Sequence, residues 1–340
     1  MHIRFRQLNL CTRGTLVRAL GATAVSLSVL LSWPLKDAMA SEPFGQWLKE
    51  FKTEASAAGI RPEILNEAFS NIVTIPRVIE LDRKQPEFTL TFDQYLTRVV
   101  PGSRVKKGRQ KLEENRAILE AVGAKYGVQP KYIVAFWGVE TDFGRVTGGF
   151  KLIPALATLA HDGRRSAYFR KELLNALKIL NQGHIKAKDM VGSWAGAMGQ
   201  CQFMPSSFLN FAVDHDGDGR KDIWTTKADV FASAANYLSR SGWKGDQIWG
   251  RAVTLPSGFD IALADLKIRK SISEWQELGV RRDDGSNLPT RDLQASIRLV
   301  DGPGSPAYMV YNNFNTIMKW NRSTYFAVAV GTLAEKIGGK

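Results

Sequence analysis

Apolar residues recur at helical spacing along most of the chain, which predicts a mainly helical protein. From residue 106 to 126 this spacing indicates one long amphipathic helix. Gly127 and Pro130 are typical of a helix end followed by a helix start, so we expect a second helix to run through the almost wholly apolar stretch 132–140. The same spacing predicts further helices at residues 167–180, 206–213, 227–241 and 325–336.

The segment from residue 246 to 310 has a different pattern. Short apolar runs at 253–255 and 296–300 alternate with prolines and glycines, which favours strands and turns, while 271–278 has the composition of a helical turn or two. We therefore expect a mainly α protein of the α+β type. Its expected parts are a leader (1–40), a helical N-terminal region (41–100), a helical core (101–245), a small mixed α/β insert (246–310) and a C-terminal helix that completes the core (311–340).

The first forty residues have the pattern of an export signal. A basic leader precedes an uncharged apolar run, 19–33, and Ala38-Met39-Ala40 offers a small-x-small cleavage site. The run is shorter than the roughly 20 residues that a spanning helix needs, so we expect cleavage rather than an uncleaved anchor. Cys11 lies before the apolar run, whereas a lipid-anchoring cysteine would lie after that run. We therefore predict a soluble periplasmic protein and not a lipoprotein.

The chain carries a formal net charge of +13. The leader removes five basic residues and one acid, so the mature chain stays strongly basic, which suits an anionic polymer or surface. Export and the lack of a recognition motif argue against nucleic acid as the partner. Cys201 is the only other cysteine, so no intramolecular disulfide is expected in the mature chain.

A single glutamate, Glu140, ends the apolar helix just before a glycine break. Burial of a carboxyl group penalises its charged form and raises its pKa, as a general acid near neutral pH requires. A glutamate that caps or salt-bridges a helix end fits the same pattern.

Small and aromatic residues are interleaved from residue 192 to 207. Glycines would let the backbone approach a ligand closely, while Trp194, Phe203 and Gln202 offer stacking surfaces and an amide, which sugars need. The alternative interpretation is a loop that packs helices tightly together.

Aspartates with calcium-loop spacing follow at residues 214–222. They occupy positions 1, 3, 5 and 9, a glycine stands at position 6, and Thr225 takes position 12 in place of the usual glutamate. Asp229 would then complete the coordination shell, and oxygen ligands favour calcium. The expected ligands are Asp214, Asp216, Asp218, Arg220 (at the backbone-carbonyl position 7) and Asp229. A solvated aspartate-rich turn is the alternative.

Together these motifs resemble the lytic murein transglycosylase B family. The likeness begins near residue 86, reaches the C-terminus and rests on four ordered motifs: WGVET-FG, GSWAGAMG--QFMPSS, D-DGDG--DIW, and the pair YNNF and WNRSTYFAVAV. It implies a lysozyme-like helical core with Glu140 as the one catalytic acid and base. The implied reaction is non-hydrolytic cleavage of the β-1,4 bond between N-acetylmuramic acid and N-acetylglucosamine in peptidoglycan, giving 1,6-anhydro products.

The resemblance also implies a substrate cleft. Its expected residues are Arg164, Arg165, Tyr168, Ser193, Gln202, Phe203, Tyr237, Trp320 and Asn321. The family more often has tyrosines where this chain has Trp320 and Phe326, so a catalytic helper hydroxyl there is in doubt, and whether Tyr325 substitutes is open. The chemistry needs no cofactor, and calcium would be structural. We expect a monomer that binds glycan strands, with wall-synthesis proteins as further candidate partners.

Two other functions remain open from the sequence. A hydrolytic muramidase would use water and a second acid, for which Asp142 and Asp162 are candidates, although two residues beyond Glu140 a helical side chain points elsewhere. A non-catalytic peptidoglycan-binding scaffold would not need the buried acid, and neither would a purely structural protein.

Overall fold

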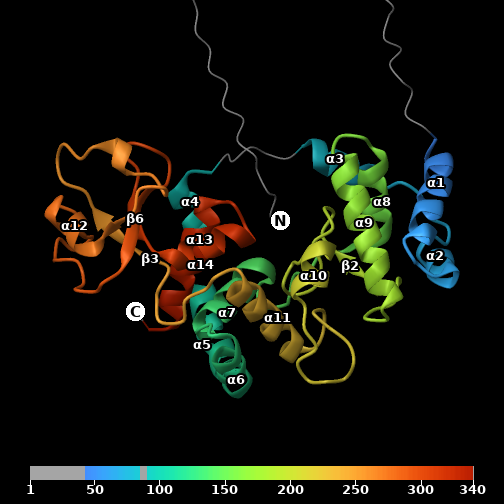
Figure 1. The fold of residues 1–340 in the computed structure, drawn as a ribbon, viewed down its shortest axis with the longest axis horizontal. Coiled ribbons are helices and arrows are strands. Elements are labelled where there is room, and N and C mark those ends of the chain that lie inside the picture. The colour runs from blue at the N-terminus through green and yellow to red at the C-terminus, as the bar shows by residue number, and fades with distance from the viewer. Residues whose placement is uncertain (1–42, 85–89, 340) are drawn as a thin grey trace, which may run out of the picture.

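The computed structural model describes residues 43–84 and 90–339, so the predicted leader lies outside the described residues. Two of the first four helices begin at a proline whose fixed φ suits the first turn. They are α1 (Phe44–Ala57), α2 (Pro62–Ala68), α3 (Pro76–Arg83) and α4 (Phe92–Val99). Figure 1 places α1, α2 and α3 around α8 and α9, whereas α4 lies beside α13 and α14.

The long helix predicted from 106 to 126 is wrong, because the structure has two helices there. They are α5 (Gly102–Glu114) and α6 (Arg116–Tyr126), separated at Asn115. Asn115 leaves helical geometry with φ −118° and ψ 20°, and its side-chain amide donates to the carbonyl of Lys111 at 2.8 Å. An asparagine that bonds its own backbone competes with the helical ladder, and this ends α5.

The expected stop and start after α6 are confirmed. Gly127 adopts the left-handed conformation with φ 68°, and α7 (Pro130–Thr141) begins at the proline. Every residue of α7 from Tyr132 to Thr141 is buried, so this helix runs through the middle of the core. Figure 1 shows α7 between α14 on one side and α11 on the other, and both pack against it.

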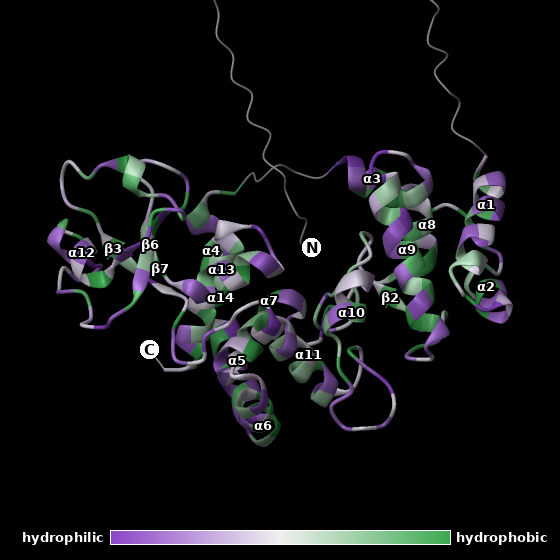
Figure 2. Cartoon of the chain, viewed as in Figure 1, coloured by the Kyte–Doolittle hydropathy of each residue, from purple (hydrophilic) through white to green (hydrophobic). Residues whose placement is uncertain are grey.

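The remaining helices complete the core around α7. Those at 166–181, 205–211, 227–240 and 324–337 lie within a residue or two of the predictions, but two more were not predicted. They are α8 (Leu152–His161), α9 (Ser166–Asn181), α10 (Pro205–Phe211), α11 (Lys227–Arg240), α13 (Asn312–Trp320) and α14 (Thr324–Ile337). In Figure 2 purple and green alternate along many of these helices, as expected for amphipathic helices with one buried face. No helix in the described part is long and apolar enough to cross a membrane.

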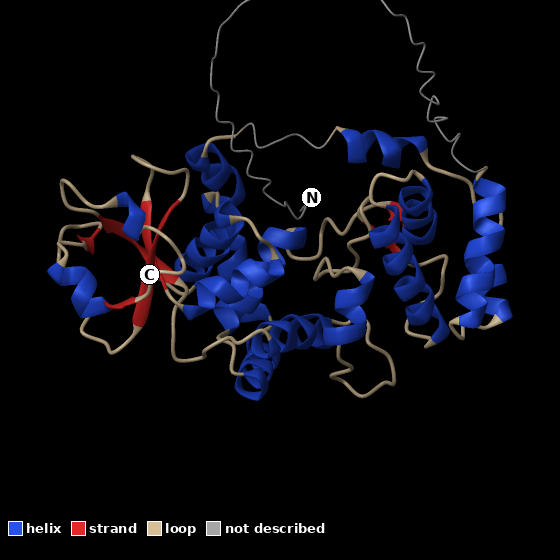
Figure 3. Ribbon diagram, turned by 45° about the horizontal axis from the view of Figure 1, so that its top comes forward, coloured by secondary structure: helices blue, strands red, loops and turns tan. Residues whose placement is uncertain are grey.

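A small antiparallel sheet gathers at one end of the molecule, as Figure 3 shows. Its strand order is β4-β6-β7-β3-β5, and a separate pair, β1 with β2, lies near α8. The element bounds are β1 (Phe150–Lys151), β2 (Val191–Gly192), β3 (Gly250–Thr254), η1 (Ile261–Leu263), β4 (Lys270–Ser271), α12 (Ile272–Glu277), β5 (Arg281–Arg282), β6 (Gln294–Leu299) and β7 (Ala307–Val310).

The two faces of this sheet pack into two different hydrophobic clusters. Alternate residues of a strand point to opposite faces, and both faces are buried here. Val310 belongs to the main cluster with the helices, whereas its neighbour Met309 joins a second cluster around Trp275 of α12. The register pairs Ile297 with Met309 and therefore keeps Ile297 in that second cluster. The sheet thus joins its own small core to the helical one.

Candidate active site

Glu140 lies in the last turn of α7 and is 8% exposed. Burial among apolar and aromatic side chains raises its pKa to about 8, because the charged carboxylate loses its hydration there. A carboxyl group with that pKa holds its proton at neutral pH and can still give it up. Such a group can act first as a general acid and then as a base.

Trp320, the last residue of α13, meets Glu140 directly. Its indole Nε1–H donates to Glu140 Oε1 at 2.8 Å, across 180 positions of sequence. Three aromatic rings surround the indole, with centroid distances of 4.6 Å to Phe136, 4.7 Å to Tyr237 and 5.2 Å to Phe203. The acid therefore stands beside an aromatic wall built from α7, α11, α13 and the loop before α10.

The backbone turns sharply just after Glu140. Asp142, Phe143 and Gly144 all have positive φ, of 50°, 61° and 80°. Non-glycine residues adopt this region at a cost, so surrounding contacts must hold the turn. The Asp142 carboxylate provides them: it accepts from Arg145 at 2.6 Å and from Lys107 at 3.3 Å, with Arg104 3.9 Å away. Burial raises the pKa of Asp142, but these cationic donors outweigh it and hold the pKa below its usual value.

Asp142 therefore has the contacts of an anchor for the end of α7. We expect Asp142→Asn to lower the melting temperature by a few degrees, corresponding to about 1 kcal/mol, because asparagine tolerates the left-handed backbone but loses the charge. Turnover at neutral pH should stay within about tenfold of the parent, measured with the polymer that the sequence resemblance implies as substrate. A loss as large as that of Glu140→Gln would instead make Asp142 a second catalytic acid.

Close backbone approaches shape the loop that carries Ser193. A side chain at Gly192 would meet the carbonyl of Ala197 at 2.2 Å, and one at Gly148 would meet the carbonyl of Gly192 at 2.1 Å. The loop closes on itself, because the amide of Ser193 donates to Ala197 O at 2.7 Å and Ser193 Oγ accepts from Ala197 N at 3.0 Å. Only glycine permits this path at both positions.

The predicted cleft residues Gln202, Phe203 and Tyr237 come together around this loop. Gln202 has φ 50°, and its amide nitrogen donates to the carbonyls of Thr147 and Gly199, both at 3.0 Å. Phe203 and Tyr237 are buried against each other with a centroid distance of 5.8 Å. The amide nitrogen of Gln202 thus supports the backbone at the site.

Three residues near the acid were not predicted as part of the site. Gln200 accepts from the Trp137 indole at 2.8 Å and donates to Trp224 O at 2.8 Å. Tyr95 and Cys201 lie within electrostatic reach of Glu140, and burial is the main cause that raises the pKa of each above its ordinary value. Gln200 and Cys201 stand inside a motif that the sequence had already singled out, whereas nothing in the sequence points to Tyr95.

A narrow cavity of about 10 Å³ lies behind Glu140, which is the size of a single water site. Its lining residues are mostly apolar and include Phe136, Phe231, Cys201 and Trp320. Apolar side chains therefore surround the small space beside Glu140, which agrees with its raised pKa.

The predicted cleft arginines are engaged with the N-terminal helices. Arg164 and Arg165 both bond the carboxylate of Asp82 in α3, which is only 1% exposed. Tyr168, on the first turn of α9, is 38% exposed. Asp162, considered above as a second acid, pairs with Arg83 at 2.8 Å. These bonds tie α3 to the turn between α8 and α9.

Asn321 directly follows the last residue of α13. Asn321 is 6% exposed, and its Oδ1 is buried with no hydrogen-bond partner among the described residues. The Tyr325 hydroxyl donates to Asp301, and Phe326 is fully buried. Asn321 therefore keeps an unused acceptor, while Tyr325 uses its hydroxyl elsewhere.

Three carboxylates converge at the aspartate-rich loop. Oxygen atoms of Asp214, Asp216 and Asp229 lie within 4.8 Å of one another. Asp229 stands in the first turn of α11 and accepts from the amides of His215 and Asp222, both at 2.7 Å. Burial and the neighbouring acids raise its pKa. An all-oxygen set of this kind fits a hard cation.

The other predicted loop residues have partners of their own. Asp218 accepts from the backbone N–H of Arg220 at 2.8 Å, and the Thr225 hydroxyl donates to Asp222. Thr225 is therefore bonded to the loop itself, and Asp229 faces the loop from α11.

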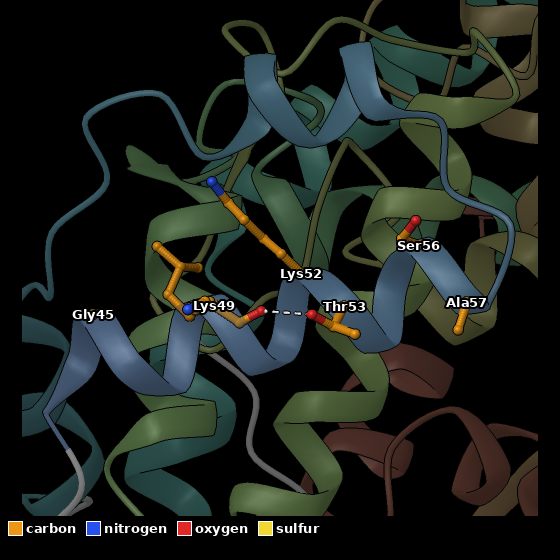
Figure 4. Close-up of a pocket in the computed structure, with 7 residues that line it drawn as sticks. Gly45, Lys49, Lys52, Thr53, Ser56 and Ala57 are labelled. Carbon is orange, nitrogen blue, oxygen red and sulfur yellow. Dashed lines mark hydrogen bonds between the residues drawn. The ribbon is translucent and has the colours of Figure 1, made fainter.

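A separate hollow lies on the surface of α1, away from all of these residues. It is lined by Gly45, Leu48, Lys49, Lys52, Thr53, Ser56 and Ala57. Figure 4 shows these side chains along one open side of the helix, with the Thr53 hydroxyl donating to Lys49 O at 3.1 Å. Among the residues that line this hollow, only the two lysines have a group suited to acid–base chemistry.

Comparison with known proteins gives consistent matches. The family described as "Transglycosylase SLT domain" matches residues 43–335. The chain is 38% identical over 218 residues to the membrane-bound lytic murein transglycosylase B of Escherichia coli, a match covering 62% of this chain and 58% of that protein. The chain thus matches less than two thirds of this curated relative.

Solved structures match over more of the chain. SltB3 from Pseudomonas aeruginosa in complex with NAG-NAM-pentapeptide superposes with a TM-score of 0.86 and 44% identity, covering 88% of this chain and 80% of that one. The Escherichia coli lytic transglycosylase Slt35 in complex with calcium gives a TM-score of 0.73 and 30% identity, covering 88% and 94%.

Proposed function

Because the chain belongs to the transglycosylase SLT domain family, we propose that it is a lytic transglycosylase that cleaves the MurNAc-β-1,4-GlcNAc bond of peptidoglycan without water. The observation that carries this proposal is the buried acid beside the aromatic wall, Glu140, with its raised pKa and its indole partner. Asp142 and Asp162 are both held by arginines, which favours a one-acid mechanism over a hydrolytic one.

One carboxyl group can carry out both halves of the reaction. Protonated Glu140 gives its proton to the oxygen between the two sugars, and the C1–O bond breaks. The resulting carboxylate accepts the proton of the muramoyl C6 hydroxyl, whose oxygen then bonds C1 to close the 1,6-anhydro ring. The proton count balances, and Glu140 ends the cycle in its acid form. Its raised pKa lets it serve in both states.

We propose that the glycan strand binds along the residues around Glu140. Ser193, Gln202, Phe203 and Tyr237 would shape the cleft, and the unused Oδ1 of Asn321 would accept a hydrogen bond from a sugar N–H or O–H. The half-buried Trp320 would add a stacking edge, and Arg164, Arg165 and Tyr168 would line the cleft at α9. A relative captured with NAG-NAM-pentapeptide supports this substrate class.

The product decides between the two reactions. Mass spectrometry of muropeptides released from purified peptidoglycan should show 1,6-anhydro species, lighter by one water than hydrolytic products. Reducing muramic acid ends would instead establish a hydrolytic muramidase. Release of no products, with binding to sacculi retained, would establish a scaffold.

We also propose that Ca²⁺ binds at Asp214, Asp216 and Asp229, with Asp218 and the Arg220 carbonyl as further ligands. The convergence of three acids and the calcium complex of a relative support this site. The ion would join the loop to the start of α11 and would have no part in the proton transfers. No cofactor is needed for the chemistry.

Calcium should therefore raise the melting temperature. At a concentration about 100 times its dissociation constant, the expected gain is on the order of 5 °C, because a ligand that binds only the folded state stabilises it by about 2.7 kcal/mol. Calorimetry with calcium and with a chelator measures this gain. Asp216→Ala should lose it, whereas Asp246→Asn, an exposed acid outside the loop, should keep it. Equal melting with and without calcium would contradict the site.

We propose that the chain is exported to the periplasm through its leader and acts there as a soluble monomer. The mature chain would consist of four parts: residues 41–100, 101–245, 246–310 and 311–340. Its basic charge supports attraction to an anionic wall rather than to nucleic acid. Fractionation of cells that express the full chain, followed by mass determination of the mature N-terminus, tests the export.

A further inference from the structure

We propose that Trp320 is a positioning residue for Glu140, whose indole N–H holds Oε1 and so assigns the transferable proton to Oε2. This inference rests on the proposed function and deepens it. It gives a role to an indole that the sequence predicted only as a stacking surface.

An indole N–H can donate a hydrogen bond but cannot accept one. Oε1 therefore serves as an acceptor whether Glu140 is protonated or ionised. In the acid form a carboxyl group has one carbonyl oxygen and one hydroxyl oxygen, and the carbonyl oxygen is the better acceptor. The donor thus favours Oε1 as the carbonyl oxygen and leaves the proton on Oε2. A tyrosine hydroxyl, which both donates and accepts, would not make this distinction.

The structure holds the indole in place from both ends of α13. At the start, the Asn313 side chain, fully buried, bonds the backbone of Lys244 and Gln247 at 2.8 to 2.9 Å. At the end, the Tyr237 hydroxyl donates to Lys319 O at 2.8 Å. Both sets of bonds come from α11 and the segment after it, so the indole is fixed to the same frame as the cleft.

Aromatic contacts fix the plane of the ring as well. The indole meets Phe136 at an interplanar angle of 43°, Phe203 at 54° and Tyr237 at 63°. A ring enclosed in this way cannot swing its N–H away from Oε1 without displacing its neighbours.

Two titratable groups of the described part of the chain that interact electrostatically with Glu140 stay neutral near neutral pH. Tyr95 from α4 and Cys201 from the loop after β2 both have a pKa raised above its ordinary value, mainly by burial. The alkaline fall of activity therefore reports Glu140. A hydrogen bond to the ionised carboxylate stabilises that form, so loss of the indole donor should raise the pKa of Glu140.

The test compares Trp320→Phe with the parent over a pH range. Phenylalanine keeps an aromatic ring but removes the donor. We expect kcat to fall about 10- to 100-fold through lost orientation and the alkaline limb to move up by about one pH unit. Trp275→Phe is the matched control, because it also deletes an indole donor, to Ala295 O at 3.0 Å, in the second cluster. It should change neither quantity.

A second measurement uses the parent fold. The ¹⁵N–¹H resonance of the Trp320 indole should titrate with the pKa of Glu140 and should stop titrating in Glu140→Gln. An indole signal that does not titrate, or a Trp320→Phe variant whose activity falls equally at every pH with an unmoved limb, would overturn the inference. Neither result would bear on the proposed function, which fails if the released products lack the anhydro ring or if no products are released.

Discussion

Glu140→Gln should lower turnover on peptidoglycan by about 10³-fold or more while leaving the fold intact. General acid–base catalysis contributes roughly 10² to 10⁴-fold, and here one group supplies both the acid and the base. The glutamine oxygen can still accept from the Trp320 indole, so the hydrogen bond and the aromatic wall stay in place. Only the exchangeable proton is lost, and the measurement is the initial rate of muropeptide release.

Glu172→Gln is the control for this loss. Glu172 is also a buried glutamate, 3% exposed, and it accepts from the amide and hydroxyl of Ser206 at 2.8 and 2.7 Å. Its replacement tests whether turnover falls whenever a buried carboxyl group is removed. Turnover of that variant should stay near the parent value at temperatures where the variant is folded. A Glu140→Gln protein that keeps a tenth or more of the parent rate would contradict the catalytic assignment.

The same substitution should stabilise the protein at neutral pH. The pKa of Glu140 rises from 4.5 to about 8 on folding, so the folded state favours the protonated form. Below pH 4.5 both states are protonated and no penalty exists. Between pH 4.5 and 8 the unfolded chain ionises while the folded one resists, and the free energy of unfolding falls. At pH 7 Glu140→Gln should be more stable by roughly 3 kcal/mol, since one pKa unit corresponds to about 1.4 kcal/mol.

Urea unfolding of both proteins from pH 4 to pH 8.5 measures this difference. The two curves should meet near pH 4 and separate as the pH rises, with a plateau above pH 8. A gap that stays constant over the range would mean that burial does not shift the titration of Glu140. A catalytic site is expected to cost stability in this way, because burial keeps the charged form of its acid out of water.

Local sequence patterns predicted most helices. They singled out Glu140 as a candidate because an acid ends an apolar run, and the family resemblance then implied its catalytic role. The break at Asn115 escaped them, since apolar spacing continues across it and only the side-chain bond to Lys111 ends α5. The aspartate loop was recognisable because its aspartates and glycine follow the spacing of known calcium loops. Its partner Asp229 was expected, and the structure brings it to the loop.

Contacts between segments far apart in the sequence could not be predicted from any local pattern. The indole of Trp320 was interpreted as a stacking surface, and its bond to Glu140 depends on how the end of α13 meets α7. The bonds of Arg164 and Arg165 to Asp82 likewise join segments about 80 positions apart. Such pairs follow from packing, which a one-dimensional pattern does not contain.

The placement of α13 after the sheet has a consequence for when this acid becomes competent. Glu140 is synthesised well before the chain reaches residue 320, and the whole sheet segment lies between them. A nascent, truncated or C-terminally clipped chain would hold the acid without the donor that orients it. Under the proposed function, such a chain would not cleave peptidoglycan until α13 lies against α7, so the completion of folding would determine when the acid can act.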